Sequence, residues 1–250
     1  MPSVSCHIFR LIIILGFLSL VATAWAESGT ELYTSGDHAG AVKAFEQDLT
    51  NVSGAGQAPV LNNIGTCYVA LGQPDKAVGY YTRAVTVDPS YGRGWINLGV
   101  VQEKLGKPEE AISSYDKVDL TNQAMYAEAM VKKGSLLAGQ GDLDKALAAF
   151  RLAEPGATGQ AVVDLYTGIG AVEFLQKNTV AAEEAFLKAT EADPNGAALA
   201  FTNLGVLRIS QGKYEEAKSL LETAARNDRN GQTNAVEYLK KLSAMTGEKE

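Results

Sequence analysis

The chain has 250 residues, of which 46% are apolar, with two cysteines, two histidines and a formal net charge of −7. This is an ordinary globular composition, which excludes disordered, collagen-like and disulfide-stapled classes. A balance of 22 Lys and Arg against 29 Asp and Glu argues against a nucleic-acid-binding surface, because phosphate binding depends on clustered cations.

The first 26 residues have the pattern of a secretory signal peptide. They contain one arginine and no acidic residue, then the apolar run LIIILGFLSLV, residues 11–21, and the small residues Ala24 and Ala26. The uncharged stretch is shorter than the roughly 20 residues that span a bilayer, so cleavage before Glu27 is favoured over an uncleaved anchor facing outside the cytoplasm. Cys6 precedes the apolar run, which argues against a lipid anchor. The predicted location is the periplasm or the extracellular space.

After the leader, the chain repeats one pattern. The segment LNNIGTCYVALGQPDKAVGYY, from Leu61, aligns with WINLGVVQEKLGKPEEAISSY, from Trp95, and their glycines, proline and second tyrosine coincide. Related copies begin at Gly29, Met130, Tyr166 and Phe201. Self-similarity at this spacing is typical of repeat proteins, in which each unit packs mainly on its neighbours.

Each copy predicts two helices joined by a tight turn. In the second copy, apolar or small residues recur at three- and four-residue steps, which marks one face of a helix. Gly72 ends the first helix, because glycine tolerates positive φ, and Pro74 begins the second, where a backbone N–H has no helical partner. Gly65 and Ala77 are small where the two helices approach, and Tyr81 fills the space beside them.

These positions resemble the tetratricopeptide repeat family, whose unit of about 34 residues carries Trp, Leu-Gly, Tyr, Ala, Phe and Pro in this order. The matching residues are Trp95, Leu98, Gly99, Gly65, Tyr68, Ala77, Tyr81, Ala84 and Pro89. Lys177 departs from the pattern, because it stands where the other copies have a turn glycine. The resemblance implies an all-α fold, namely a right-handed α-solenoid of about six helical hairpins with a C-terminal capping helix.

The predicted divisions follow the repeats. Residues 1–26 form the signal peptide, and residues 27–57 form a degenerate first repeat that lacks the start of its first helix. Repeats two to six span residues 58–91, 92–126, 127–162, 163–197 and 198–231. Residues 232–250 form a capping helix and tail, which repeat arrays need at their ends.

The resemblance also implies a binding groove, because the first helices of such repeats line a concave surface. Mixed apolar and amide side chains there suit an extended peptide or a helix of another protein. The expected groove residues are Asn62, Asn63, Thr66, Arg93, Ile96, Asn97, Val100, Glu103, Glu128, Val131, Ser135, Thr167, Phe174, Thr202 and Asn203.

Three of these asparagines, Asn63, Asn97 and Asn203, share one repeat position. They are similar to the asparagine ladder of O-linked GlcNAc transferase, although asparagine is also simply common at this position in the family. Lys132 and Gly168 interrupt the ladder. The residues with which some family members clamp the terminal carboxylate of a chaperone are not recognisable, so that partner class is not expected.

The sequence contains no motif of a known catalytic or metal site, and we expect no enzyme activity, cofactor or metal. Without the leader, His38 and Cys67 are the remaining imidazole and thiol. A lone histidine in a turn lacks the partners that acid–base chemistry needs, and Cys67 is most simply a small buried hydrophobe. The Lys132-Lys133 and Lys240-Lys241 doublets are too small for a nucleic-acid or membrane patch, so stable membrane insertion after cleavage is not expected.

Taken together, these features predict an exported, non-enzymatic scaffold or adaptor that binds a partner peptide or protein in its groove. One alternative is an envelope-assembly factor similar to the six-repeat pilotins. Another is a regulatory subunit of a cell-envelope enzyme complex. The identity of the partner is not encoded in any motif of the chain.

Overall fold

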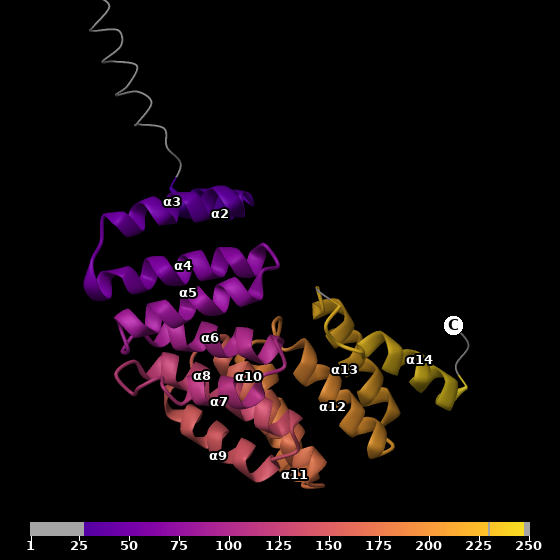
Figure 1. The fold of residues 1–250 in the computed structure, drawn as a ribbon. Helices are drawn as coiled ribbons and strands as arrows, with labels where there is room; N and C mark the ends of the chain where they lie inside the picture. The colour runs from indigo at the N-terminus through magenta and orange to yellow at the C-terminus, as the bar shows by residue number, and fades with distance from the viewer. Residues whose placement is uncertain (1–27, 230, 248–250) are drawn as a thin grey trace, which may run out of the picture. The chain divides into compact units, whose positions relative to one another are not determined.

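The computed structural model describes residues 28–229 and 231–247. The predicted signal peptide lies outside these residues. The chain divides into two compact units, Met1–Pro89 and Ser90–Glu250. Within the described residues every regular element is a helix, so the predicted all-α class is confirmed (Figure 1).

The first unit contains two helical hairpins. Its elements are α2 (Gly29–Ser35), α3 (His38–Thr50), the short 3₁₀ helix η1 (Gly54–Gly56), α4 (Gln57–Ala70) and α5 (Pro74–Val87). Helix α2 is short, and a capping box starts it, in which Ser28 and Glu31 satisfy each other's backbone N–H groups. Consecutive α-helices pack on one another, and Phe45 and Ile64 are among the buried residues at their interface.

The second unit continues the same arrangement. Its elements are α6 (Gly92–Lys104), α7 (Pro108–Tyr115), α8 (Gln123–Gly139), α9 (Leu143–Ala153), η2 (Glu154–Gly156), α10 (Gln160–Leu175), α11 (Thr179–Ala192), α12 (Ala198–Ser210), α13 (Tyr214–Asn227) and α14 (Ala235–Thr246). Each helix packs on the next, and α6, α8, α10 and α12 also contact one another in sequence. The first helices of these hairpins therefore form one row, and α14 covers α13 at the end of it.

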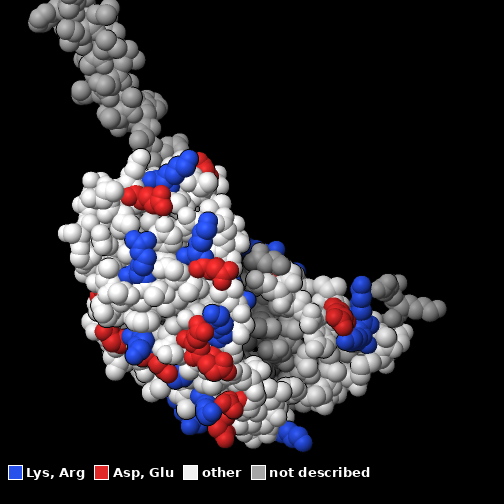
Figure 2. All heavy atoms as spheres, in the orientation of Figure 1, with Lys and Arg blue, Asp and Glu red and all other residues white. Residues whose placement is uncertain are grey.

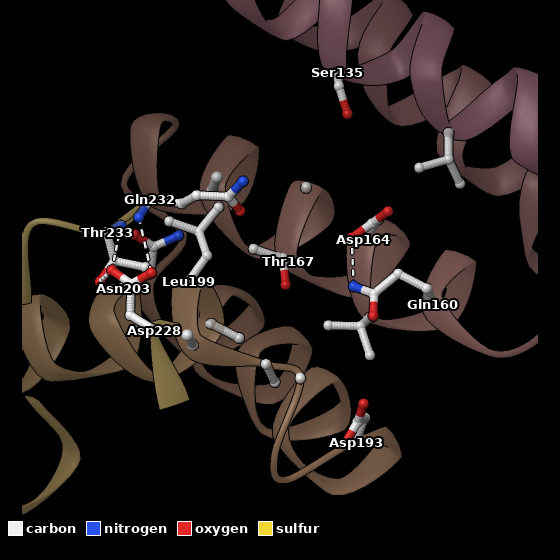
Figure 3. A pocket seen from close by; sticks show the side chains of 18 of the residues that line it. Ser135, Gln160, Asp164, Thr167, Asp193, Leu199, Asn203, Asp228, Gln232 and Thr233 are labelled. Atoms are coloured by element: carbon white, nitrogen blue, oxygen red, sulfur yellow. Dashed lines mark hydrogen bonds between the residues drawn. The ribbon is translucent and has the colours of Figure 1, made fainter. Parts of the chain in front are cut away.

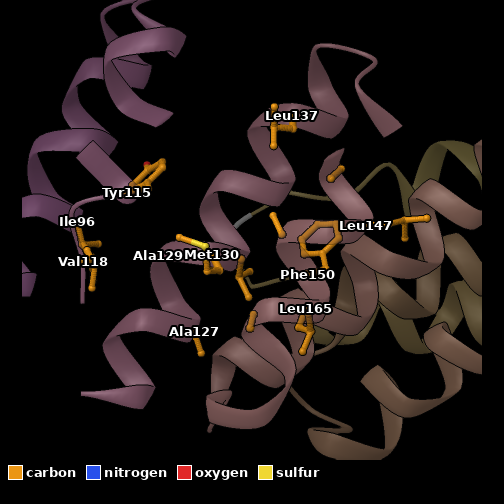
Figure 4. Packing of buried hydrophobic residues seen from close by; sticks show 14 of the residues in the cluster. Ile96, Tyr115, Val118, Ala127, Ala129, Met130, Leu137, Leu147, Phe150 and Leu165 are labelled. Atoms are coloured by element: carbon orange, nitrogen blue, oxygen red, sulfur yellow. The ribbon is translucent and has the colours of Figure 1, made fainter. Parts of the chain in front are cut away.

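Each hairpin closes on a glycine, as the sequence predicts. A Cβ atom at Gly65 would lie 2.6 Å from the Tyr81 ring, and one at Gly134 would lie 2.6 Å from the Phe150 ring. Only glycine lets the ring approach the first helix this closely. Figure 4 shows Phe150 among Leu147 and Leu165, which belong to the same buried cluster. The packing interpretation of the repeated glycine is confirmed.

The turn between the two helices of a hairpin has positive φ throughout the series. Gly72, Gly106 and Gly141 have φ values of 69°, 72° and 86°. Lys177 takes the same conformation with φ 67°, and among the described residues it is the one non-glycine with positive φ. The turn between α10 and α11 therefore has the same left-handed conformation as the others, although a residue with a side chain is strained in it.

Three first helices begin earlier than the predicted repeat boundaries, α4 by one residue, at Gln57, and α8 and α10 by more. Helix α8 begins at Gln123, ahead of the boundary at residue 127, and α10 begins at Gln160, ahead of the boundary at residue 163. The α7 helix ends at Tyr115, so residues 116–122 form turns in place of the rest of a second helix. Among the described helices, none is both long enough and apolar enough to cross a bilayer.

Candidate functional site

A groove runs across the row of first helices in the second unit. Its larger part, which we call the groove cavity, has a volume of about 870 Å³ and is lined by α6, α8, α10, α12 and the segments that follow α11 and α13 (Figure 3). An adjoining cavity of about 560 Å³ shares Val131, Lys132, Gln160 and Asp164 with it. The two cavities are therefore parts of one continuous groove.

The structure brings together many of the predicted groove residues of this unit. The groove cavity is lined by Val100, Glu103, Val131, Ser135, Thr167 and Asn203. The adjoining cavity is lined by Arg93 and Glu128, whose side chains form an ion pair of 2.9 Å between α6 and α8.

Three predicted groove residues lie in the interior instead. Asn62, Ile96 and Thr202 are 6%, 1% and 3% exposed. Ile96 and Thr202 line neither cavity of the groove. Val131 and Thr167 stand at the same repeat position and are 4% and 7% exposed, yet both line the groove cavity. This position therefore reaches the groove in α8 and α10 and lies in the interior in α4, α6 and α12.

Phe174 also differs from the prediction. Its side chain packs against a buried cluster that includes Phe186 and Leu204, and it does not line the groove cavity. The apolar contact with the neighbouring helices explains why this aromatic residue is turned inward.

The predicted asparagine ladder is not continuous along the groove. Asn203 lines the groove cavity, whereas Asn97 does not line it. At the same repeat position α10 has Gly168, where a Cβ atom would collide with Cζ of Phe150. The ladder is therefore interrupted because the Phe150 ring occupies the space beside Gly168.

The first unit contains the predicted groove residues of α4. Asn63 and Thr66 are half-buried on α4. The Thr66 hydroxyl lies 3.1 Å from the carbonyl oxygen of Asn62, to which it donates, and 3.1 Å from the hydroxyl of Tyr81. Thr66 thus serves the packing of its own hairpin.

One wall of the groove cavity is a group of oxygen acceptors that sequence reasoning missed. Gln160 Nε2 donates a hydrogen bond of 2.9 Å to Asp164 Oδ1. A Cβ atom at Gly196 would collide with Asp193 Oδ2 and lie 3.4 Å from Gln160 Oε1, so these two oxygens approach the same point. The helical period provided a signal for Asp164, because it precedes Thr167 by three residues on α10.

Thr167 places a polar group on the floor of the same cavity. The residue is 7% exposed, and among the described residues its hydroxyl has no hydrogen-bond partner. At the equivalent position of α12, Thr202 donates a hydrogen bond of 2.9 Å to the carbonyl oxygen of Ala198. Figure 3 shows Thr167 between Asn203 and Gln160, with its oxygen facing the open cavity.

The other titratable groups have structural explanations. Burial raises the pKa of the Cys67 thiol. Hydrogen bonds from Arg208 lower the pKa of Glu183 to about 2, and the two side chains form a bidentate pair. Burial also raises the pKa of the Tyr115 hydroxyl, with the Glu103 carboxylate adding to the effect. Among the described residues, no three His, Cys, Asp or Glu side chains are grouped so that they could hold a metal ion.

The sequence matches tetratricopeptide repeat models over residues 58–91, 92–123, 120–162 and 200–233. These matches cover more than half of the chain, and the chain therefore belongs to the tetratricopeptide repeat family. It is 28% identical over 110 residues to the heat shock protein STI1 of Saccharomyces cerevisiae, which is 43% of this chain and 18% of that protein. The chain spans less than a third of the length of the curated relatives it matches.

Solved structures share the fold at low sequence identity. The Cut9–Hcn1 structure of the APC/C superposes with a TM-score of 0.66 and 18% identity over 87% of this chain and 42% of that chain. PilW, a type IV pilus biogenesis factor, superposes with a TM-score of 0.65 and 17% identity over 76% of this chain and 86% of that chain. At this identity the similarity concerns the fold alone.

Proposed function

We propose that the protein is a non-enzymatic scaffold that holds an extended segment of a partner protein in the groove of the second unit. The observation that carries the proposal is the continuous groove across α6, α8, α10 and α12, in which two cavities share four side chains. An extended polypeptide needs a long surface with both hydrogen-bonding and apolar groups. The groove cavity offers both, since Asn203 and Gln160 line it together with Val163 and Leu199.

The charge distribution fits a protein partner. On the face shown in Figure 2, Lys and Arg side chains alternate with Asp and Glu side chains and form no broad area of one sign. This face therefore lacks the extended positive potential that nucleic acids require.

A catalytic role for this chain has less support. The carboxyl group with the most strongly lowered pKa, that of Glu183, is explained by its pairing with Arg208 on a neighbouring helix. His38 packs against Tyr33, with 4.9 Å between the ring centroids. Neither Glu183 nor His38 lines the groove cavity or the adjoining cavity, where a catalytic group would have to meet the bound segment.

We further propose that the protein is exported. The support is the leader pattern of residues 1–26, with its apolar run and small residues before Glu27. Sequencing the N-terminus of the protein from its native cells tests this point. A first residue of Glu27 in a fraction outside the cytoplasm is expected, and an intact N-terminus in the cytoplasm would contradict export.

Site-specific photo-crosslinking tests the groove. A photo-reactive amino acid at Ser135, which is exposed and lines the groove cavity, is expected to crosslink a partner in native cells. The matched control is the same amino acid at Ser113, which is exposed on α7 and does not line the groove. Equal crosslinking from the two positions, or none from Ser135, would contradict the proposal.

The identity of the crosslinked partner also separates the more specific alternatives. An envelope-assembly factor would crosslink to a component of an outer-membrane assembly, and a regulatory subunit would crosslink to an enzyme. Mass spectrometry of the crosslinked product distinguishes these outcomes.

A further inference from the structure

We propose that the groove cavity selects a lysine or arginine of the bound segment, with the cationic head among Asp164, Gln160 and Asp193. The inference rests on the proposed function, because it assumes that the groove holds a polypeptide. It goes further by naming the side chain that the groove recognises and the residues that recognise it.

The first argument is that this wall presents carboxylate and amide oxygens to the cavity. Gln160 uses its amide N–H to reach Asp164 Oδ1, which turns its own oxygen, Oε1, toward the loop after α11. Asp193 accepts a hydrogen bond of 3.0 Å from the backbone N–H of Asn195 through Oδ1, which leaves Oδ2 near Gln160 Oε1. No cation of the described residues pairs with Asp164 or Asp193. A partner group with several N–H donors and a positive charge satisfies these oxygens best.

The second argument comes from Thr167, which lies on α10 beside this wall. The residue is 7% exposed and its hydroxyl lacks a partner among the described residues, although a helical threonine can bond to its own backbone, as Thr202 does. The Thr167 oxygen is not among the enclosed polar atoms without a partner, so it is open to the cavity. A donor or acceptor of the bound segment can therefore form a hydrogen bond with it.

The third argument is the apolar surface that leads to the oxygens. Val163 and Ala171 line the cavity from α10, and Leu199, which is 51% exposed, lines it from α12. Lysine and arginine carry long apolar stems below their charged heads, so such a channel stabilises the stem while the head reaches the carboxylates.

The other charged groups of the groove define where the cation can lie. Lys104, Lys132 and Arg229 also line the groove cavity and would repel a cation placed close to them. Asp228 accepts hydrogen bonds from the backbone N–H groups of Gln232 and Thr233, at 2.8 and 2.7 Å, and Glu103 accepts one of 3.2 Å from Tyr115. Among the acidic side chains that line the groove cavity, Asp164 and Asp193 are therefore the two whose carboxylates we assign to the cation.

The test uses the immobilised full chain and synthetic 12-residue peptides. Each peptide carries one fixed central residue, which is lysine, arginine, norleucine, glutamine or glutamate, and random residues elsewhere. We expect the wild-type protein to retain lysine and arginine peptides about tenfold better than norleucine peptides, which have the apolar stem without the charge.

Two sets of variants assign the selection to the site. The double variant Asp164→Asn with Asp193→Asn is expected to lose the tenfold preference while retaining norleucine peptides as before. Glu191→Gln is the matched control, because Glu191 is exposed on α11 and does not line the groove, and it is expected to keep the preference. Thr167→Val is expected to weaken retention of all peptides severalfold without changing the order among them.

The outcomes separate this inference from the proposed function. Selection of norleucine or glutamate in the groove, or a lysine preference that survives in the double variant, would overturn the basic specificity while leaving groove binding intact. Equal retention of every peptide would also overturn it. The crosslinking experiment from Ser135 tests groove binding independently of these results.

Discussion

The α8/α9 and α12/α13 hairpins start from the same packing requirement and meet it with different side chains. In α8/α9 the fully buried ring of Phe150 fills the space beside Gly134 and reaches Gly168 of the next helix. In α12/α13 the smaller Leu221 lies beside Gly205, where a Cβ atom would be 2.8 Å from Leu221 Cγ. One aromatic side chain thus joins three helices in the first case, and an aliphatic side chain closes one hairpin in the second.

The last hairpin has an ionic contact at Arg208, whose side chain is 10% exposed. The cations in the ion pairs that link the α8/α9 hairpin to residues outside it, Arg93 and Lys133, have side chains that are 37% and 23% exposed. Arg208 of α12 is 8% exposed and donates two hydrogen bonds of 2.7 Å to the oxygens of Glu183 on α11. Its Nε lies 2.8 Å from a carboxylate oxygen of Glu216 on α13. The contact around Phe150 is apolar and the contact around Arg208 is ionic, so of these two contacts only the one at Arg208 should respond to pH.

The largest expected effect is the loss of the Phe150 ring. Phe150→Ala removes a fully buried side chain that contacts three helices, and we expect a loss of about 4 kcal/mol in the free energy of unfolding. Leu221→Ala is expected to lose less, about 3 kcal/mol, because the leucine is smaller. Urea denaturation followed by helical circular dichroism measures both, and Leu152→Ala, at a side chain 54% exposed, is the control. A larger loss for Leu221→Ala would contradict the comparison.

The same comparison shows what could be predicted from sequence. The hairpin order, the closing glycines and the ring at Tyr81 follow from small and apolar residues at helical spacing, because burial imposes that spacing on each copy. The inward position of Ile96 and Thr202 could not be inferred as easily. Which side chains face inward depends on how neighbouring hairpins are oriented relative to each other, and the residue pattern of a single copy does not determine that orientation.

The binding wall was missed for a related reason. Asp193 lies in the segment after α11, and its approach to Gln160 depends on the path of that segment past Gly196. Both residues belong to the α10/α11 hairpin but lie at its two ends, and the repeat pattern does not specify how the segment after α11 returns to the start of α10. In the sequence, Lys177 departs from the turn glycine of the other repeats, but only the structure shows that it keeps their left-handed conformation.

The next effect in size is the pH dependence of the ionic contact. Hydrogen bonds from Arg208 lower the pKa of Glu183 from its ordinary value of 4.5 to about 2. A lowered folded-state pKa means that the stabilisation is present above pH 4.5 and is lost as the pH falls toward 2. We expect this to amount to about 1–2 kcal/mol, since the Glu183 side chain is 31% exposed and solvent weakens the pair.

Glu183→Gln tests that dependence against a neighbouring control. The difference in unfolding free energy between wild type and Glu183→Gln should shrink between pH 5 and pH 2, as measured by urea denaturation at each pH. Glu184→Gln removes the adjacent carboxylate, which is 68% exposed and pairs with Lys188, and should show little change. If both variants followed the same pH profile, the special role of the Arg208 contact would be excluded.

The smallest effect separates the two threonines at one repeat position, Thr167 of α10 and Thr202 of α12. Thr202→Val removes the hydrogen bond to Ala198 and should cost about 0.5–1 kcal/mol, because valine keeps the branched shape but lacks the hydroxyl. Thr167→Val removes a hydroxyl that has no partner among the described residues. The free energy of unfolding of this variant should therefore stay within about 0.5 kcal/mol of the wild-type value or rise slightly. Paired urea denaturation of the protein without peptide resolves the difference.

An equal loss in the two variants would mean that the Thr167 hydroxyl is already bonded within the protein. It would then not be available to a bound segment, and the floor of the groove cavity would be a packing surface.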